Sequence, residues 1–251
     1  VMHLKGCVFD DTVLYSGASI NDVYLDFNNR YRLDTYHEIY SPHLADSMCA
    51  YVNEAFHTNY AVQDFSQGEV KNAKQIRDEI RVLTRHLTKV QYNFKGEHIG
   101  RQDIGICPIA GLGKKKNNLN RTVLWMIGAA KSHLFICTPY FNPPKQILQQ
   151  LEAALHSGVK ITLLVGDKTA NDFFIQPEEQ FSAIGVIPYI YEQNLRSFIQ
   201  KHLEYLQSGQ LEVMLWKDEN NSFHVKGIFV DQSYALITGN NLNPRAWGLD
   251  L

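Results

Sequence analysis

Two copies of one eight-residue pattern constrain the fold of this chain more than any other feature. Residues 3–10 read HLKGCVFD and residues 224–231 read HVKGIFVD, so histidine, lysine, glycine and aspartate recur at the same spacing. After each copy a glycine is followed four residues later by asparagine, once at 17–21 and once at 239–243. A pattern that returns in this way indicates an internal duplication. We therefore expect two similar structural halves.

Each copy also has the residue types of a β-strand, in which residues i and i+2 point to the same face. His3 should then lie beside Lys5, and His224 beside Lys226. Such a pair offers a base or nucleophile next to a fixed positive charge. If the two halves meet about a pseudo-two-fold axis, both pairs converge on one centre. That centre suits phosphoryl transfer, with one histidine attacking phosphorus and the other protonating the leaving oxygen.

Four further residues of the two copies join this predicted site. Asn21 and Asn243, together with the lysines, are predicted to hold the nonbridging phosphate oxygens. Asp10 and Asp231 complete the predicted catalytic set as the last residues of the repeated pattern. Seven steps of ~3.3 Å place Asp10 roughly 23 Å from His3 along an extended strand. A role in a turn, or towards the opposite half, therefore fits these aspartates better than direct orientation of their own histidine.

Composition excludes several other kinds of protein. With 24 Lys and Arg against 26 Asp and Glu, the net charge of −2 gives no general attraction to nucleic acid, so we predict no specific nucleic-acid partner. The four cysteines form no C-x-x-C pair, which argues against a zinc or redox site and fits a reducing cytoplasm. The proposed chemistry needs no metal, and we predict no cofactor. No apolar run approaches the ~18 to 20 residues of a membrane span.

Local patterns predict an α/β fold. A hairpin is expected at 3–9 and 12–15, followed by a helix of about four turns after Ser41-Pro42 and a second helix at 70–90. These two helices form an expected helical insertion. After a loop at 111–120 come strands at 134–138 and 160–165 around a helix opened by Asn142-Pro143, a helix ending at Gly209, and strands at 211–215, 223–230 and 234–238.

This order predicts mixed sheets in two pseudo-symmetric halves. Residues 1–110 are expected to be the end of the first half with its insertion, and residues 111–251 the second half. Since the chain opens within an apparent strand, we expect it to be a piece of a longer protein.

The duplicated H-x-K-x4-D pattern resembles the phospholipase D superfamily. The resemblance implies an α/β/α sandwich made of paired halves and a reaction through a phosphohistidine. It also implies that His3, in the first motif, is the nucleophile, with His224 as acid and then base. Many members have G-S-x-N in the next segment, where this chain has Gly17-Ala18-Ser19-Ile20-Asn21 and Gly239-Asn240-Asn241-Leu242-Asn243. Which serine or asparagine meets phosphate therefore stays open.

Four further segments resemble the phosphatidylserine synthases of Gram-negative bacteria, and this resemblance runs along nearly the whole chain. They are YRLDTYH at 31–37, TPYFNP at 138–143, GDKTANDF at 166–173 and NPRAW at 243–247. It implies that the enzyme takes CDP-diacylglycerol, releases CMP and passes the phosphatidyl group to L-serine. It also implies that the first half is incomplete here, with its first strands upstream of Val1. Tyr36, His37 and Arg245 are candidate serine ligands within these segments.

The sequence is also compatible with other functions. A cardiolipin synthase or a phospholipase D-type phosphodiesterase would differ only in the acceptor. A membrane or nucleic-acid binding module on a scaffold that has lost its catalytic activity is disfavoured by the two intact His-Lys pairs.

The second predicted helix carries a row of cations. Arg77, Arg81, Arg85 and Lys89 recur every four residues and form either a band that contacts anionic lipid or a solvated face. We expect a cytoplasmic protein that associates peripherally with an anionic membrane surface; the sequence does not predict its oligomeric state.

Overall fold

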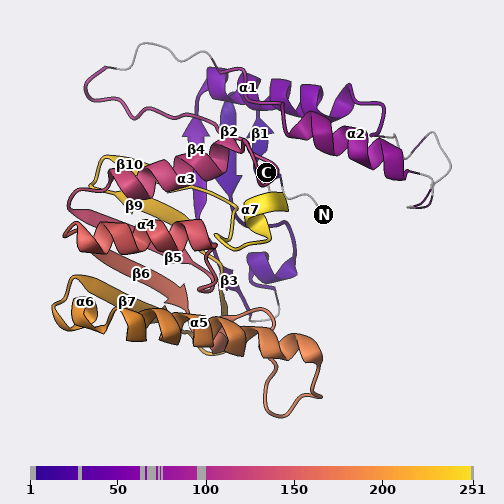
Figure 1. Ribbon diagram of the computed structural model, residues 1–251. Coiled ribbons are helices and arrows are strands. Elements are labelled where there is room, and N and C mark those ends of the chain that lie inside the picture. The colour runs from indigo at the N-terminus through magenta and orange to yellow at the C-terminus, as the bar shows by residue number, and fades with distance from the viewer. Residues whose placement is uncertain are drawn as a thin grey trace. The chain divides into compact units, whose positions relative to one another are not determined.

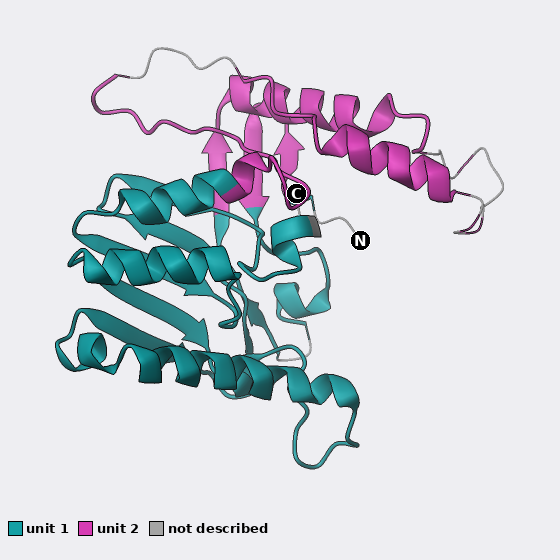
Figure 2. Ribbon diagram, viewed as in Figure 1, with its two compact units in different colours: residues 1–5, 16–36, 121–250 teal, residues 6–15, 37–120, 251 magenta. Residues whose placement is uncertain are grey.

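The computed structural model describes residues 4–27, 30–62, 66, 72, 74, 76–94 and 100–249 (Figure 1). The chain divides into two compact units that alternate along the sequence (Figure 2). Unit 1 comprises Val1–Lys5, Ser16–Tyr36 and Arg121–Asp250, and unit 2 comprises Gly6–Tyr15, His37–Asn120 and Leu251. The expected boundary at residue 110 concerns the two homologous halves, and it stays a prediction.

Unit 1 contains a five-stranded mixed sheet. Its order is β10 (Tyr234–Ile237), β9 (Gly227–Val230), β5 (His133–Thr138), β6 (Lys160–Gly166) and β7 (Leu211–Trp216). The strands β5, β6 and β7 are parallel, whereas β9 is antiparallel to both of its neighbours. The predicted βαβ unit is confirmed, because α4 (Lys145–His156) connects the parallel strands β5 and β6. The mixed sheet confirms the predicted α/β class.

The helices of unit 1 lie against this sheet and bury its apolar side chains. In Figure 1, α4 and α5 (Ile187–Lys201) cross the side of the sheet that faces the viewer, and the shorter α6 (Leu203–Gln207) lies near β7. α4 buries one stripe of side chains because its apolar residues recur at steps of four. The stripe consists of Ile147, Leu151 and Leu155, and the strands contribute the buried Leu134, Ile161, Leu163, Leu211 and Ile228.

One expectation for the middle of the chain is wrong. Residues 118–120 belong to α3 (Asn118–Ala129) and not to the predicted loop at 111–120. The buried Asn117 side chain accepts a hydrogen bond from the backbone N–H of Asn120, as an N-cap does. α4 begins two residues later than the start expected at Asn142-Pro143, with Pro144 in place of Asn142 as its N-cap residue.

Unit 2 combines a three-stranded sheet with two helices. The sheet has the order β1 (Cys7–Phe9), β2 (Thr12–Ser16) and β4 (Tyr36–Tyr40), which confirms the predicted hairpin. The first strand is shorter than the expected 3–9, because residues 4–6, including Lys5, lie before it. The first helix, α1 (Pro42–Val52), is also confirmed; the Ser41 side chain accepts from Leu44 N–H, and a short π-helix at Asn53–His57 extends it. Of the helix expected at 70–90, the structure contains α2 (Arg77–Leu87). Residues 72, 74, 76 and 88–90 are not helical, and residues 70, 71, 73 and 75 lie outside the described residues.

The strand expected at 223–230 is divided in two. β8 (Ser222–Phe223) pairs in parallel with β3 (Arg32–Leu33), whereas β9 pairs with β5, so the chain changes sheets between them. Residues 224–226 make this transition, and the backbone N–H of His224 donates to Leu33 O at 2.8 Å. The second repeat is thereby joined to the segment that follows the first repeat. Among the helices that the structure describes, none has the length and apolar character needed to cross a bilayer.

Candidate active site

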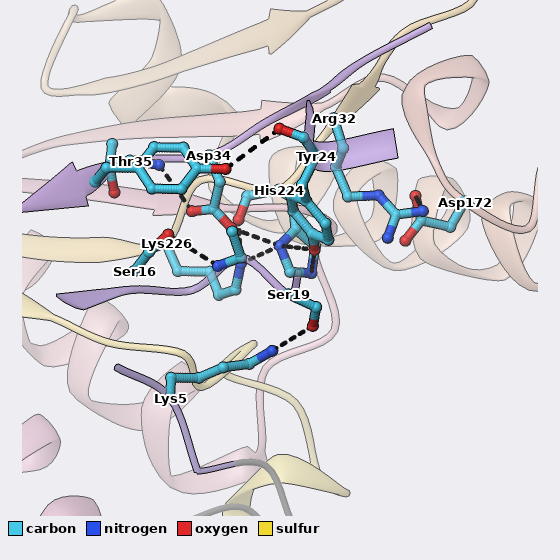
Figure 3. Close-up of polar contacts among 12 residues, drawn as sticks. Lys5, Ser16, Ser19, Tyr24, Arg32, Asp34, Thr35, Asp172, His224 and Lys226 are labelled. Carbon is cyan, nitrogen blue, oxygen red and sulfur yellow. Dashed lines mark hydrogen bonds and ion pairs between the residues drawn. The ribbon is translucent and has the colours of Figure 1, made fainter. Parts of the chain in front are cut away.

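The pairing of β3 with β8 brings Asp34 to the second copy of the motif. Asp34 follows β3 and His224 follows β8, so the register places the two residues side by side. The carboxylate oxygen Oδ2 of Asp34 lies 2.7 Å from His224 Nδ1 and 3.3 Å from Lys226 Nζ (Figure 3). Lys226 Nζ is also 2.6 Å from His224 Nδ1 and donates to the backbone carbonyl of His224. The predicted proximity of His224 and Lys226 is therefore present, although neither residue lies in a strand.

Burial sets the charge state of this cluster. The side chains of Asp34 and Lys226 are each 1% exposed, and that of His224 is 16% exposed. Burial alone would raise the pKa of Asp34, but the hydrogen bond from His224 and the charge of Lys226 outweigh it and lower the pKa. Burial lowers the pKa of Lys226 to about 8 despite Asp34. Burial also lowers the pKa of His224, so its neutral form dominates at neutral pH.

The contact with Asp34 determines which nitrogen of His224 can react. An ionised carboxylate only accepts hydrogen bonds, so Nδ1 carries the hydrogen and donates it to Asp34. The lone pair then lies on Nε2, where it can accept a proton or attack an electrophile. This is the arrangement of a histidine whose tautomer and orientation are fixed by a carboxylate.

Tyr24 forms a second contact with the same imidazole. It lies in the short helix η1 (Asp22–Leu25), and its hydroxyl oxygen is 2.8 Å from Nδ1 and 3.4 Å from Nε2 of His224. The two rings meet edge to face, with centroids 5.5 Å apart. Burial raises the pKa of Tyr24 to about 12, so the phenol stays protonated. The Arg32 guanidinium lies over the Tyr24 ring and forms an ion pair with Asp172.

The first copy of the motif contributes Lys5 to the same unit. Lys5 Nζ donates to Ser19 Oγ at 2.6 Å (Figure 3), so one of the open candidates for phosphate contact adjoins the first lysine. The positive charge of Lys5 also contributes to lowering the pKa of Lys226. His3 lies outside the described residues. The proposed convergence of the two imidazoles therefore stays a prediction.

Two glycines link the copies in a reciprocal way. A Cβ atom added to Gly17, in the first copy, would lie 3.0 Å from Lys226 Nζ, in the second. A Cβ atom added to Gly239, in the second copy, would lie 3.1 Å from Lys5 Cγ, in the first. Each repeat therefore supplies the glycine against which the lysine of the other repeat packs. This exchange supports the expected pseudo-two-fold relation between the copies.

The hydrogen bonds after each motif are also repeated. Ser16 Oγ accepts from Ala18 N–H and Thr238 Oγ1 accepts from Asn240 N–H, both at 3.0 Å. The two predicted phosphate ligands are helix caps in the structure. The Oδ1 atom of Asn21 accepts from Tyr24 N–H at 3.4 Å, and that of Asn243 accepts from Ala246 N–H at 2.7 Å, at the start of α7 (Ala246–Leu249).

The two motif aspartates lie at turns. Asp10 and Asp231 have left-handed backbone conformations, with φ of 50° and 51°. The Asp231 carboxylate accepts hydrogen bonds from the backbone N–H groups of Lys131, Ser132 and His133 and from the Ser132 hydroxyl. These bonds lower the pKa of Asp231 well below its usual range. Its contacts are with the chain that enters β5, not with His224.

The repeat gives no signal for Asp34, Tyr24, Arg32 or Asp172. Three of these stand in the segments quoted for their family resemblance, which was the only signal that could have found them. Within the described part of the chain, no group of three or more His, Cys, Asp or Glu could hold a metal ion. The described site contains an imidazole, two ammonium groups, a carboxylate and a phenol.

Comparison with known proteins adds the family. Residues 123–251 match the protein family described as "Cardiolipin synthase, PLD-like domain". Over its full length the chain is 43% identical to the CDP-diacylglycerol–serine O-phosphatidyltransferase PssA of Escherichia coli (strain K12). It is 44% identical to the CDP-diacylglycerol–serine O-phosphatidyltransferase of Haemophilus influenzae (strain ATCC 51907 / DSM 11121 / KW20 / Rd). The chain spans 55% of the length of each of these enzymes.

The fold agrees with these matches. The crystal structure of phosphatidylserine synthase from Haemophilus influenzae Rd KW20 superposes on the whole chain with a TM-score of 0.90 at 41% identity, and the chain covers 56% of it. The resemblance inferred from the duplicated motif is confirmed. The family match extends over more than half of the chain and includes the complete second motif with His224 and Lys226. The chain therefore belongs to the family of phospholipase D-like domains.

Proposed function

We propose that the protein containing this chain transfers the phosphatidyl group of CDP-diacylglycerol to L-serine, forming phosphatidylserine and releasing CMP. The observation that carries this proposal is the 43–44% identity, over every residue of the chain, to two enzymes named for this reaction. The His224 cluster adds the chemistry, because it presents a neutral imidazole beside a buried ammonium group.

The reaction proceeds in two steps in this proposal. In the first, Nε2 of His3 attacks the phosphorus of the phosphatidyl group, and the bond to the CMP oxygen breaks. CMP leaves as a phosphate monoester, whose second pKa is about 6, so this step needs little help from a general acid. In the second, the serine hydroxyl oxygen attacks phosphorus, its proton passes to Nε2 of His224, and the bond to His3 breaks.

The described environment of His224 suits the second step. A general base must be unprotonated when the acceptor arrives, and burial keeps the imidazole in that form by lowering its pKa. Asp34 then stabilises the imidazolium that forms when His224 takes the proton. Lys5 and Lys226 are proposed to offset the negative charge on the nonbridging oxygens.

Contact with an anionic membrane surface is a further part of the proposal. Arg77, Arg81 and Arg85 are exposed along α2, and Lys89 is exposed just beyond it. Leu83 and Leu87 of the same helix pack into a core cluster, so the cations occupy the side of the helix away from that core. This arrangement supports peripheral binding through electrostatic attraction to anionic headgroups.

Quenching the full-length protein with labelled CDP-diacylglycerol in the absence of serine tests the covalent step. We expect a lipid-linked phosphohistidine at His3 that is lost in His3→Ala. In parallel, serine, phosphatidylglycerol and water are compared as acceptors. Serine should give the fastest product formation, whereas a preference for phosphatidylglycerol would indicate a cardiolipin synthase and a preference for water a phosphodiesterase. Full activity of His3→Ala would contradict the mechanism.

A further inference from the structure

An ion pair lies next to the reactive histidine but outside the chemistry described above. Arg32 Nη2 is 2.7 Å from Asp172 Oδ1, and the two side chains are 19% and 32% exposed. The Arg32 guanidinium carbon lies 4.9 Å from the centre of the Tyr24 ring, and the same ring contacts His224. The ion pair and the imidazole thus flank one phenol ring, as Figure 3 shows.

The chemistry of this pair matches an amino acid. A serine molecule carries an α-carboxylate and an α-ammonium group on one carbon, so both charges must be met at neighbouring positions. An adjacent guanidinium and carboxylate offer the two opposite charges at that spacing, and arginine binds carboxylates with two parallel hydrogen bonds. We propose that Arg32 binds the α-carboxylate and Asp172 the α-ammonium group of the acceptor serine, which directs its hydroxyl towards Nε2 of His224. This inference rests on the proposed function and names its acceptor site.

The donor capacity of Arg32 supports this assignment. The Nε atom of Arg32 is buried and hydrogen-bonds to none of the described residues. The pair is also accessible enough to receive a small ligand, unlike the fully buried ion pair between Lys226 and Asp34. Within the described chain, Arg32 is the one ion-pair partner of Asp172, so the pair is not part of a larger surface network.

Position distinguishes this pair from a similar one in the same unit. Lys168 and Glu192 form an ion pair of 2.9 Å with side chains that are 31% and 27% exposed. Lys168 lies over the ring of Tyr189, not over a ring that contacts His224. This second pair therefore provides a matched control. Its exposure is nearly equal, but we expect no effect of its substitution on serine binding. Two of the residues that the sequence suggested as serine ligands are placed differently. Tyr36 is exposed and its hydroxyl donates to the backbone carbonyl of Tyr24, and Arg245 is exposed.

The test separates the two half-reactions in the full-length protein. Serine-independent exchange of labelled CMP into CDP-diacylglycerol reports the first step, and the KM for serine reports the acceptor site. For Arg32→Gln and Asp172→Asn we expect the KM for serine to rise roughly 10- to 100-fold, with CMP exchange within about twofold of wild type. For Lys168→Gln and Glu192→Gln we expect neither quantity to change.

Substrate analogues test each charge by itself. Ethanolamine lacks the carboxylate, so Arg32→Gln should narrow the preference for serine over ethanolamine. A hydroxy acid of the same length lacks the ammonium group, so Asp172→Asn should narrow the preference for serine over that acid. The exchanged pair Arg32→Asp with Asp172→Arg keeps an ion pair and hence the local fold, and it should lose serine transfer while retaining CMP exchange.

Two results would overturn the assignment. One is an equal loss of serine transfer and CMP exchange in the Arg32 and Asp172 variants, which would make the pair a clamp between β3 and the loop after β6. The other is a KM for serine that is unchanged in the Arg32 and Asp172 variants. A wild-type protein that exchanges CMP but gives no product with serine would instead refute the proposed function.

Discussion

The two copies of the motif have the same local sequence but different surroundings. In the second copy, Lys226 is buried and contacts both Asp34 and His224. In the first, Lys5 is only partly buried and donates to Ser19 Oγ. The difference arises because Asp34 reaches the second copy through the pairing of β3 with β8. The motif determines which side chains are neighbours, and a residue from elsewhere in the chain sets their charge.

Removal of the Asp34 charge should have the largest effect on the difference between the two copies of the motif. In Asp34→Asn the buried Lys226 ammonium loses its counter-charge, and the imidazolium of His224 loses its stabilising partner. We expect kcat to fall about 10³-fold and the free energy of unfolding to fall by about 3 kcal/mol. Steady-state kinetics and urea unfolding of the full-length protein measure these effects.

Acid titration supplies the control for this variant. Because the pKa of Asp34 is lowered in the folded state, its contribution to stability is present above the ordinary aspartate pKa of about 4 and is lost as the pH falls through the lowered value. Asp34→Asn should lack that acid-side loss. An unchanged stability profile between pH 2 and 5 would contradict the charged role of Asp34.

The pH dependence of catalysis should separate the two lysines. With a pKa of about 8, Lys226 loses its charge within the working range, and kcat/KM should fall up to about tenfold per pH unit above that value. Lys226→Arg keeps a charge at all accessible pH values, so the fall should move to higher pH. In Lys5→Arg the alkaline fall should stay near pH 8. The same fall in all three proteins would assign it to another group.

The reciprocal glycines offer a matched pair of smaller changes. In Gly17→Ala the new methyl group meets Lys226 Nζ and Asp34 Oδ2, both at 3.0 Å, in a buried ion pair that cannot move aside. We expect a loss of about 2 kcal/mol in the free energy of unfolding. In Gly239→Ala the methyl group meets the flexible stem of Lys5 at 3.1 Å, so we expect about 0.5 kcal/mol or less. Urea unfolding measures the free energy of unfolding of both variants. Equal losses in the two variants would contradict the expected difference between the two glycine contacts.

The capping asparagines should show the smallest difference. Asn243 is buried and bonds both Ala246 N–H and the Tyr140 hydroxyl, whereas Asn21 is exposed and makes a longer bond. We expect Asn243→Ala to cost about 1–2 kcal/mol of stability and Asn21→Ala a few tenths, about 0.3 kcal/mol. Asn21→Ser and Asn243→Ser keep a capping oxygen but remove the amide donor. A selective loss of kcat/KM in the serine variants would support the predicted phosphate contacts.

Much of this fold follows from periodic patterns in the sequence. Ser41-Pro42 predicts the start of α1, and the alternation after Leu134 predicts β5, α4 and β6, because capping and strand signals are local. The interruption of the strand at 224–226 could not be predicted. β3 and β8 have two residues each, which is too short for a periodic signal, and their pairing joins segments about 190 residues apart.

In the site, too, the local features could be predicted from the sequence and the tertiary contacts could not. The repeat led to His224 and Lys226, since residues two positions apart stay close along the chain even though neither lies in the strand that the pattern predicted. Asp34 and Tyr24 belong to neither copy of the eight-residue motif, and only tertiary pairing brings them to the imidazole. The spacing of Asn21 and Asn243 suggested phosphate contacts, but an asparagine three residues before a helical N–H is also a cap. Spacing alone could not separate these two roles.

The exchange of glycine and lysine between the copies has the symmetry of a contact in a two-fold dimer, where residue i of one subunit touches residue j of the other and the reverse. A chain that carries both copies retains this interlock without needing a second molecule. A bulkier residue at position 17 therefore meets Lys226 and Asp34, and one at position 239 meets Lys5. Each half therefore limits the side chains that the other can hold at this contact, and the limit is tighter at position 17 than at position 239.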